Sequence, residues 1–257
     1  MSENAAEGRA AATVVIVRDL PAAAPHLLMM ERAASMAFAA GALVFPGGAV
    51  DDADRAFALT LARGGEDIDD VAARIAAIRE TLEESGLAIG FRNAVEATKL
   101  MDMRAALAAG ASLAQIADAH GLEFSLDQLV PFARWHPAAA EHVTRIFDTR
   151  FYLVRAPASQ QPSVDLTENV RLFWSGARDT IARCDAGEGR IIFPTRRNLE
   201  RLALFDSFDA MAAHAASVPV EMVRPWVEDR AGQRHLCIPS HLGYPVTSEP
   251  LSIVQRG

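Results

Sequence analysis

The sequence contains very few cysteines and almost no lysine. Its two cysteines, Cys184 and Cys237, lie far apart along the chain, which excludes a disulfide scaffold and a cysteine-based zinc site. Such sparse use of cysteine is typical of a reducing compartment, so we expect a cytoplasmic protein. Lys99 is the only lysine, so arginine supplies almost all of the positive charge and would bind phosphate wherever it lines a site.

Long hydrophobic runs and a targeting signal are also missing. The apolar stretch at residues 37–44 is far shorter than the ~18–20 residues that cross a bilayer. The first nine residues are polar and acidic, unlike a secretory signal. A net charge of −8 argues against a nucleic-acid partner, which needs a clustered basic surface. We therefore expect neither a membrane nor a nucleic acid among the partners.

What the sequence does contain is enough apolar material for a large core. Of its 257 residues, 51% are hydrophobic and 23% are charged, which excludes global disorder. This length allows one large domain or two small ones. No internal repeat or low-complexity linker divides it. We expect a single α/β domain over residues 1–257, with a loose tail at 1–12 and a helical insert at about 93–129.

The apolar pattern predicts alternating strands and helices. Strands are expected at residues 13–17, 26–30, 42–45, 144–154, around 173–174 and at 191–193. Helices are expected after Asp51, from a cap at Asp69 or Asp70 to Gly86, in the insert with breaks at Gly110 and Gly121, and over 198–214. The segment from Val218 onward is expected to be an extended loop.

The helix that ends at Gly86 has two different faces. At 100° per residue its apolar side chains form one narrow stripe, made by Val71, Ile75, Ile78 and Leu82. Glu80, Glu83 and Glu84 fall on the opposite side, at spacings that make them neighbours. Like charges at such spacings repel, and a hard divalent cation would relieve the repulsion. Arg79 lies beside the acids, where it can hold a carboxylate in place.

These residues resemble the signature of the Nudix hydrolase family. That signature is Gly, five residues, Glu, seven residues, Arg-Glu, an apolar residue, any residue, Glu-Glu, any residue, Gly and an apolar residue. Its second half matches residues 79–87, with Thr81 at an apolar position, and Phe-Pro-Gly-Gly at 45–48 is similar to its entry. The resemblance implies a mixed sheet sandwiched between helices. Strand motifs at 145–153 and 168–174 extend it over most of the chain.

The spacing of the box departs from the family pattern. Gly48 precedes Arg79 by 31 positions instead of 14, so the box carries 17 extra residues. Gly65 has the ordinary spacing, but Val71 then stands where the first glutamate is expected. We prefer Gly48, because it follows a strand and completes Phe-Pro-Gly-Gly. The first glutamate is then unassigned, and the interruption is similar to that of the peroxisomal coenzyme A diphosphatases.

The resemblance implies cleavage of a nucleoside diphosphate linked to another moiety, by attack of water at phosphorus with Mg²⁺ or Mn²⁺. The metal ligands implied are Glu80, Glu83, Glu84, the Gly48 carbonyl and Glu168. Arg79 is implied to orient a glutamate. Catalytic roles therefore fall on Arg79, Glu80, Glu83 and Glu84.

The substrate is less defined than the chemistry. Contacts are expected from Arg32, Phe45, Gly47, Asp148 and Arg150. Coenzyme A-directed members carry a second arginine where this chain has Ala37, and arginine is the residue that would grip an extra phosphate. Nucleotide sugars and dinucleoside polyphosphates therefore stay open as substrates, as does a nucleotide sensor without activity. A homodimer also stays open.

The insert raises a separate question. It carries more apolar side chains than short isolated helices can bury, among them Leu100, Met103, Leu107 and Ile116. They pack either on the core or around a pocket beside the glutamates, which would favour substrates with a bulky apolar arm.

Overall fold

The computed structural model describes residues 8–34, 39–136, 146–164 and 169–254. Its strands are β1 (Arg9–Leu20), β2 (Ala23–Arg32), β3 (Leu43–Val44), β4 (Gly47–Ala49), β5 (Val130–Trp135), β6 (Phe147–Arg155), β7 (Asn169–Gly176), β8 (Met222–Val223), β9 (Trp226–Arg230), β10 (Gln233–Cys237) and β11 (Ser248–Pro250). Its helices are α1 (Asp52–Leu61), α2 (Ile68–Ser85), α3 (Ala97–Ala108), α4 (Leu113–His120), the 3₁₀ helix η1 (Leu126–Gln128), α5 (Ala177–Asp185), α6 (Phe193–Leu202), α7 (Phe208–Ser217) and α8 (Leu251–Val254).

Eight of the strands form one mixed sheet. The order β3-β2-β1-β6-β5-β8 runs through it, with β4 paired to β1 and β7 to β2. The pairs β1–β6 and β5–β8 are parallel, and the other pairs are antiparallel. A mixed sheet with helices on both sides is the fold class that the sequence predicted.

Strands β1 and β2 pair only near the turn that joins them, and the gap beyond this pairing holds the segment at residues 43–49. Val17 of β1 pairs with β2, whereas Thr13 pairs with β4 on the same edge. Met30 of β2 pairs with β3 on the edge that faces β1. The segment at residues 43–49 therefore fills the space where β1 and β2 separate, and its Gly-Gly sequence faces α2.

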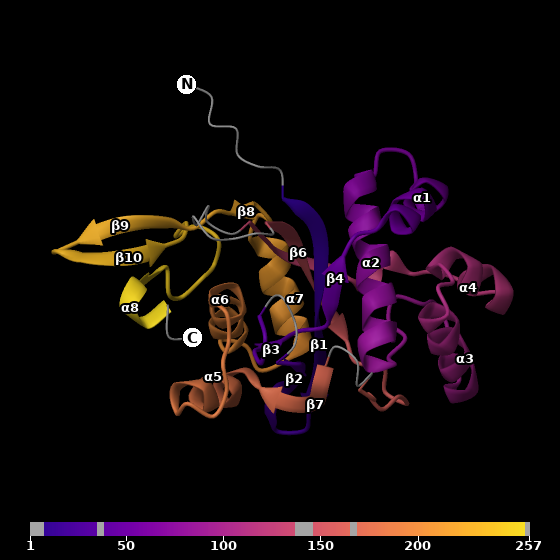
Figure 1. Ribbon diagram of the computed structural model, residues 1–257, viewed down its shortest axis with the longest axis horizontal. Helices are drawn as coiled ribbons and strands as arrows, with labels where there is room; N and C mark the ends of the chain where they lie inside the picture. The colour runs from indigo at the N-terminus through magenta and orange to yellow at the C-terminus, as the bar shows by residue number, and fades with distance from the viewer. Residues whose placement is uncertain (1–7, 35–38, 137–145, 165–168, 255–257) are drawn as a thin grey trace.

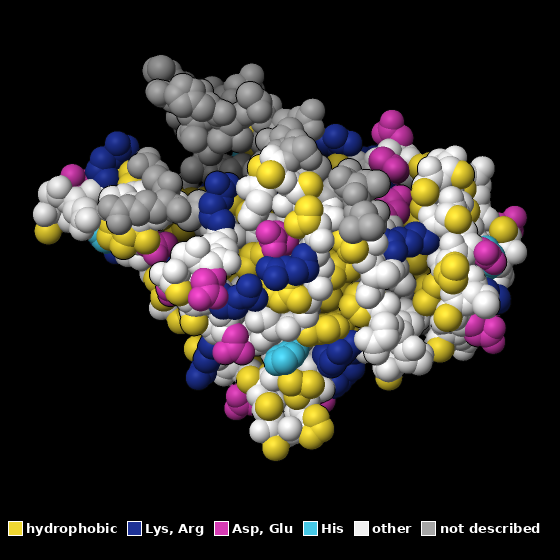
Figure 2. Space-filling model, turned by 60° about the horizontal axis from the view of Figure 1, so that its bottom comes forward, with side chains coloured by type: hydrophobic (Ala, Val, Ile, Leu, Met, Phe, Trp, Pro, Cys, Tyr) yellow, Lys and Arg dark blue, Asp and Glu magenta, His cyan; other side chains and the backbone are white. Residues whose placement is uncertain are grey.

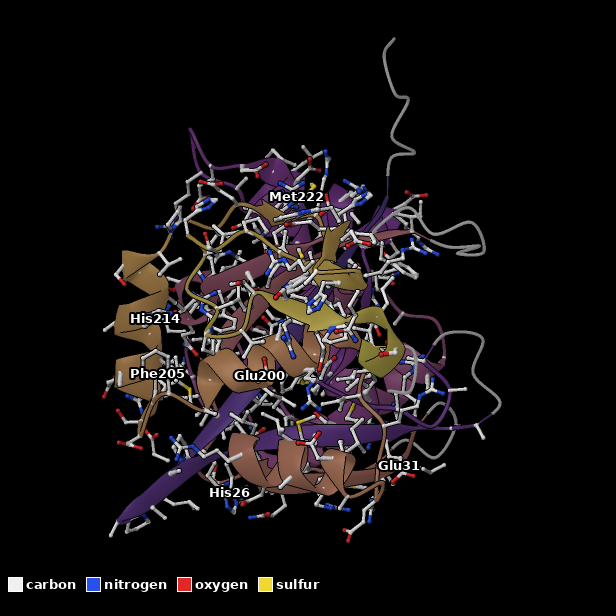
Figure 3. The ribbon with its side chains drawn as sticks, turned by 90° about the vertical axis from the view of Figure 1, so that its left-hand side faces the viewer. His26, Glu31, Glu200, Phe205, His214 and Met222 are labelled. Atoms are coloured by element: carbon white, nitrogen blue, oxygen red, sulfur yellow. The ribbon has the colours of Figure 1, made fainter. Side chains whose placement is uncertain are left out.

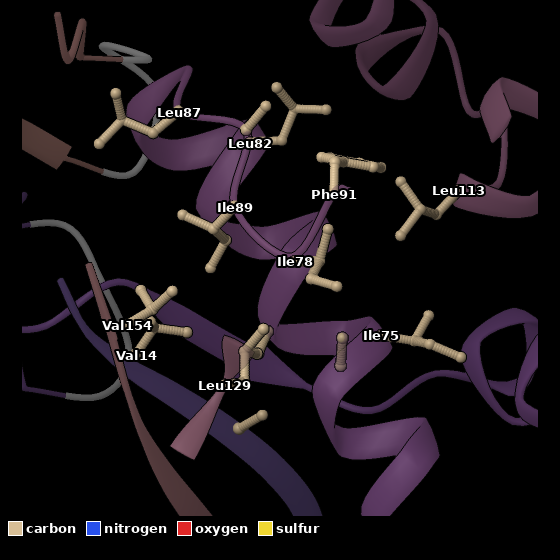
Figure 4. Close-up of a cluster of buried hydrophobic side chains, with 14 of the residues drawn as sticks. Val14, Ile75, Ile78, Leu82, Leu87, Ile89, Phe91, Leu113, Leu129 and Val154 are labelled. Carbon is tan, nitrogen blue, oxygen red and sulfur yellow. The ribbon is translucent and has the colours of Figure 1, made fainter. Parts of the chain in front are cut away.

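Helices cover both faces of the sheet (Figure 1). On one face, α1, α2, α3 and α4 enclose a core whose labelled members in Figure 4 include Val14, Ile78, Leu82, Phe91 and Val154. On the other face, α5, α6 and α7 cover a second core; Figure 3 looks onto this side, with Glu200 on α6 and His214 on α7. The small sheet β11-β10-β9 projects beyond these layers (Figure 1).

The amphipathic helix and the insert are close to expectation. Helix α2 ends where Gly86 adopts the left-handed conformation, with φ of 68°, but Asp67 rather than Asp69 or Asp70 caps its start. The insert contains α3, α4 and η1, with breaks at Gly110 and Gly121 as predicted.

Four expectations about elements are wrong. Strand β1 begins at Arg9, so the expected loose tail is too long, because residues 9–12 pair with β6. Residues 191–193 form no strand, because Pro194 fits the first turn of α6, which begins at Phe193. The helix expected over 198–214 is two helices, α6 and α7, separated by residues 203–207.

The fourth error is the C-terminal segment, which forms strands where a loop was expected. A two-residue turn joins β9 to β10, with φ of 52° at Ala231 and 80° at Gly232. Such a turn needs positive φ at both positions, and alanine is an unusual residue for it. Strand β5 was not predicted either.

The surface agrees with the charge balance of the sequence. Figure 2 shows arginine and acidic side chains interspersed, with no continuous patch of one sign on the face that it draws. Within the part of the chain that the structure describes, no helix is both long enough and apolar enough to cross a membrane.

Candidate active site

The Gly-Gly segment of β4 lies directly against α2. A Cβ atom on Gly47 would lie 2.2 Å from the Ala12 carbonyl oxygen, and φ at Gly47 is 153°. A Cβ atom on Gly48 would lie 2.2 Å from Glu80 Oε1. At Gly47 only glycine lets the backbone approach the neighbouring strand this closely, whereas at Gly48 an added Cβ would displace the end of the Glu80 side chain.

Arg79 is the centre of the polar contacts on α2. Its Nε and Nη2 donate to the two carboxylate oxygens of Asp54, at 3.1 and 2.9 Å. Its Nη1 donates to Glu80 Oε1 at 2.9 Å and to Glu83 Oε2 at 3.2 Å. Its Nη2 also donates to the carbonyl of Ala49 at 3.0 Å. One guanidinium thus joins the β4 segment, α1 and two of the glutamates.

Asp54 is a site residue that was not predicted from the sequence. It is only 2% exposed and is held in α1, which Asp51 caps through a reciprocal pair of hydrogen bonds. Asp54 follows Gly48 after five residues, which is the place of the first glutamate in the signature. An aspartate therefore occupies the unassigned position, and the 17 extra residues lie between Asp54 and Arg79. Counting forward from Gly48, with Asp accepted for Glu, would have found it.

Glu84 is held separately from the other two glutamates. The Gly47 amide donates to its Oε2 at 2.8 Å, and Asn169 Nδ2 donates to its Oε1 at 3.2 Å. Glu84 is only 4% exposed, whereas the side chains of Glu80 and Glu83 are 17% and 34% exposed. Asn169 was not predicted from the sequence.

Burial dominates the electrostatics of the carboxylates. It raises the pKa of Glu80 to about 7, against the opposing effect of Arg79 and with support from the charge of Glu83. It raises the pKa of Glu84 to about 8, although the Gly47 amide opposes the shift. The pKa values of Glu83 and Asp54 are raised as well, again mainly by burial. Burial lowers the pKa of Arg79, but its acidic neighbours outweigh this and raise it overall.

The chemistry of this donor set suits a divalent cation. The raised pKa values of Glu80 and Glu84 mean that nearby positive charge does not offset their buried negative charge. Hard carboxylate oxygens next to a backbone segment are the ligands that Mg²⁺ and Mn²⁺ accept. In their present conformation, no three Asp, Glu, His or Cys side chains among the described residues converge on a metal position. Arg79 instead engages Glu80 and Glu83, so a cation would compete with it for these oxygens.

Two of the residues expected to meet the substrate do not line this site. Phe45 is 3% exposed and packs in the core on the opposite face of the sheet. Arg150 donates to Asp69 O at 2.9 Å and to Asp67 Oδ2 at 3.2 Å, at the first turn of α2. That turn is roughly 16 Å from Glu80 along the helix at 1.5 Å per residue.

Of the other residues expected to contact the substrate, Asp148 is paired with an arginine and Arg32 lies near a glutamate of α2. Asp148 accepts two hydrogen bonds from Arg134, at 2.8 and 2.6 Å, and so forms a cross-strand ion pair. Arg32, at the end of β2, is near enough to Glu84 for its charge to oppose the rise in the pKa of Glu84. Glu168 lies outside the described residues.

The apolar side chains of the insert pack on the core. Leu100, Met103, Leu107, Leu113 and Ile116 are all buried, in the same cluster as the apolar face of α2. These side chains account for the apolar composition of the insert without an apolar arm of a substrate.

Comparison with known proteins places this chain in a family. A NUDIX hydrolase from Alicyclobacillus acidocaldarius matches with 30% identity and a TM-score of 0.70, over 80% of this chain and 96% of that chain. A MutT NUDIX hydrolase from Burkholderia pseudomallei matches with 18% identity and a TM-score of 0.41, over 76% and 97%. The NUDIX domain of Shewanella oneidensis NrtR, crystallised with ADP ribose, matches with 11% identity and a TM-score of 0.41, over 78% and 90%. No family model matches the chain.

The chain belongs to the Nudix hydrolase family. It is accordingly a Nudix-type hydrolase, an enzyme class that acts on pyrophosphate bonds.

Proposed function

We propose that this chain hydrolyses the diphosphate of a nucleoside diphosphate linked to another moiety, with Mg²⁺ or Mn²⁺, and acts as one Nudix domain. The observation that carries the proposal is the set of three carboxylates on α2 beside the Gly47–Gly48 backbone. Arg79 binds Glu80 and Glu83, and the Gly47 amide binds Glu84. The same cluster argues against a nucleotide sensor, because a protein that does not hydrolyse its ligand has no need of it.

In this proposal Glu80, Glu83, Glu84 and the Gly48 carbonyl hold the metal ion. Glu168 is an additional proposed ligand. When bound, a divalent ion neutralises the diphosphate, activates water and stabilises the leaving group.

The other residues act by positioning these ligands. Arg79 orients Glu80 and Glu83, and the bidentate contact with Asp54 fixes the plane of its guanidinium. The Gly47 amide fixes Glu84. Because all these partners lie on strands, helices and short tight segments, the backbone positions of the carboxylates are fixed before substrate arrives.

Within this class we propose coenzyme A or an acyl-coenzyme A as the substrate. The interrupted box supports it, and so does Arg32, which lies near Glu84 and can bind a phosphate of the substrate. Nucleotide sugars and dinucleoside polyphosphates are the competing substrates.

A substrate panel tests the proposal. The purified protein is incubated with coenzyme A, a nucleotide sugar, ADP-ribose and a dinucleoside polyphosphate, each with Mg²⁺, with Mn²⁺ or with EDTA. We expect two phosphomonoesters from coenzyme A, only in the presence of metal. Faster turnover of another diphosphate would make that compound the substrate in place of coenzyme A. Binding of the four compounds without turnover would favour the alternative of a nucleotide sensor.

Glu83→Gln tests the proposed ligands directly. Its side chain is partly exposed, and a glutamine keeps its shape, so folding should be preserved while kcat falls by orders of magnitude. Asp118→Asn, on the insert helix α4, is the matched control that removes a carboxylate outside the box. Equal kcat in both variants and the unaltered protein would remove Glu83 from the site.

A further inference from the structure

The last turn of α2 is held largely by groups outside the helix. A helix leaves its last four carbonyls without partners of its own, and here these belong to Leu82, Glu83, Glu84 and Ser85. Leu82 O accepts from the Gly86 amide at 3.0 Å, which is a local contact. Ser85 O accepts from the Ser163 amide at 2.8 Å. Glu83 O accepts from Arg104 Nε at 2.9 Å.

Arg104 lies on α3, in the insert, and bridges two elements. Besides Glu83 O, it contacts Ser163, whose Oγ accepts from Arg104 Nη1 at 2.8 Å. Both groups lie close over Gly86, where an added Cβ would be 2.9 Å from Ser163 Oγ and 3.3 Å from Arg104 Nη1. The insert is thus attached to the C-terminal end of the helix that carries the glutamates.

The positive charge of Arg104 also lies in a favourable position, at the C-terminal end of α2. Helix α2 has no basic residue of its own in its last turn, although a helix C-terminus carries partial negative charge. Glu83 and Glu84 add two carboxylates to the same turn. Arg104 therefore supplies, from another helix, the positive charge that this turn lacks.

The segment at residues 156–164 contacts both the end of α2 and the start of the insert. Gln160 is buried; its Oε1 accepts from the Ala88 amide at 2.8 Å, and its Nε2 donates to Val95 O at 3.4 Å. Asn169, at the start of β7, donates to Glu84. Ser163 thus belongs to a segment fixed to the end of α2 and to the start of the insert.

We propose that Arg104 is a positioning residue of the hydrolase reaction, and that the insert sets the last turn of the catalytic helix through it. Arg104 touches neither substrate nor metal; it fixes the backbone from which the side chains of Glu83 and Glu84 project. This inference rests on the proposed function, because it assumes that these carboxylates bind the metal. A displacement of about 1 Å in such a group can lower turnover by about 100-fold.

The test compares Arg104→Gln with Arg92→Gln. Arg92 is the matched control, because it pairs with Glu123 at the surface of the same region, with side chains 59% and 67% exposed. Three quantities are measured in each variant: Mn²⁺ affinity by electron paramagnetic resonance without substrate, kcat and KM at saturating metal, and the melting temperature. Mn²⁺ affinity is the readout that a merely structural role would leave unchanged.

For Arg104→Gln we expect Mn²⁺ to bind at least five-fold more weakly and kcat to fall at least ten-fold, with less than a three-fold change in KM. Arg104→Lys should recover part of both losses, because an ammonium group can still donate to the Glu83 carbonyl but lacks the planar fork. Arg92→Gln should match the unaltered protein.

The inference is overturned if Arg104→Gln binds Mn²⁺ and turns over substrate as Arg92→Gln does. If Arg104→Gln does not fold, Ser163→Ala decides instead. A loss of Mn²⁺ affinity smaller than the five-fold expected for Arg104→Gln supports the positioning role of Arg104, and unchanged affinity excludes it. If the unaltered protein cleaves no diphosphate, the proposed function fails, yet the Mn²⁺ affinities still decide on Arg104.

Discussion

Asp54 is one methylene shorter than the glutamate of the family signature, and α1 compensates for the difference. The capping box at Asp51 fixes the first turn of α1 so that Asp54 reaches both Nε and Nη2 of Arg79. Asp54 also accepts from the Asp51 amide at 3.1 Å. One buried carboxylate thus caps its own helix and holds the arginine of another.

Removing the charge of Asp54 should therefore affect both stability and turnover. In Asp54→Asn the buried Arg79 loses its main counter-ion, which should cost about 3 kcal/mol of unfolding free energy. Because Arg79 then orients Glu80 and Glu83 less well, kcat should fall more than KM rises. Urea unfolding and steady-state kinetics measure the two effects. Asp54→Glu, which restores the signature residue, should keep more activity than Asp54→Asn, and the reverse order would contradict this role.

At this scale the sequence predicted the residues whose spacing follows the helix and missed those supplied from elsewhere. Glu80, Glu83 and Glu84 follow from periodicity and resemblance alone. Asn169 reaches Glu84 only because β7 pairs with the far edge of β2. Nothing local in the sequence carries that information, which depends on tertiary pairing.

At the scale of elements, helix α4 of the insert has a complete start and stop signal. Ser112 and Gln115 form a capping box, in which Ser112 Oγ accepts from the Gln115 amide at 3.3 Å and Gln115 Oε1 accepts from the Ser112 amide at 2.8 Å. Gly121 ends the helix in the left-handed conformation. These local signals explain why the breaks of the insert could be predicted.

The cap of α4 offers a way to separate stability from catalysis. Ser112→Ala removes the acceptor for the Gln115 amide and should lower the unfolding free energy by about 1 kcal/mol. Helix α4 does not hold the glutamates, so kcat should be unchanged at a temperature where the protein is folded. Urea unfolding with parallel kinetics measures both. A large loss of kcat would mean that α4, and not only α3, acts on the site.

Elements without such signals were the ones predicted wrongly. A short apolar run such as residues 191–193 suits a strand and the start of a helix equally well, and Pro194 decides for the helix. The β9–β10 hairpin turns at Ala231-Gly232 rather than at a typical turn pair, and most of its residues are exposed. It therefore lacks the apolar alternation by which a strand is recognised.

At the scale of the whole molecule, the sheet separates two cores with different polar contents. The core under α2 leads directly to the site. The other core encloses Arg201, which is 2% exposed, donates to His214 Nε2 at 3.0 Å and lies over the ring of Phe132, 4.2 Å from its centroid. His214 packs against Phe205, with ring centroids 4.7 Å apart (Figure 3). Carboxylates with raised pKa values thus lie on α2 at one face of the sheet, and a histidine with a lowered pKa lies on the other face.

These groups should give the metal-free protein a stability maximum on the acidic side of neutrality. The folded pKa values of Glu80 and Glu84 are raised to about 7 and about 8, so their contribution is fully present below the unfolded value and is lost as the pH rises toward 8. The pKa of His214 is lowered by burial and by Arg201, so its contribution is lost as the pH falls below about 6.5.

Scanning calorimetry in EDTA from pH 5 to 9 measures both contributions. The melting temperature should fall from pH 6.5 to 8.5, and Mn²⁺ should raise it more at pH 8 than at pH 5.5, because the cation binds the ionised carboxylates. Glu84→Gln should flatten the alkaline fall and leave the acidic side unchanged, whereas His214→Gln should do the opposite. If Mn²⁺ raised the melting temperature equally at both pH values, the buried glutamates would not be the groups that bind it, and the metal site would have to lie elsewhere on the molecule.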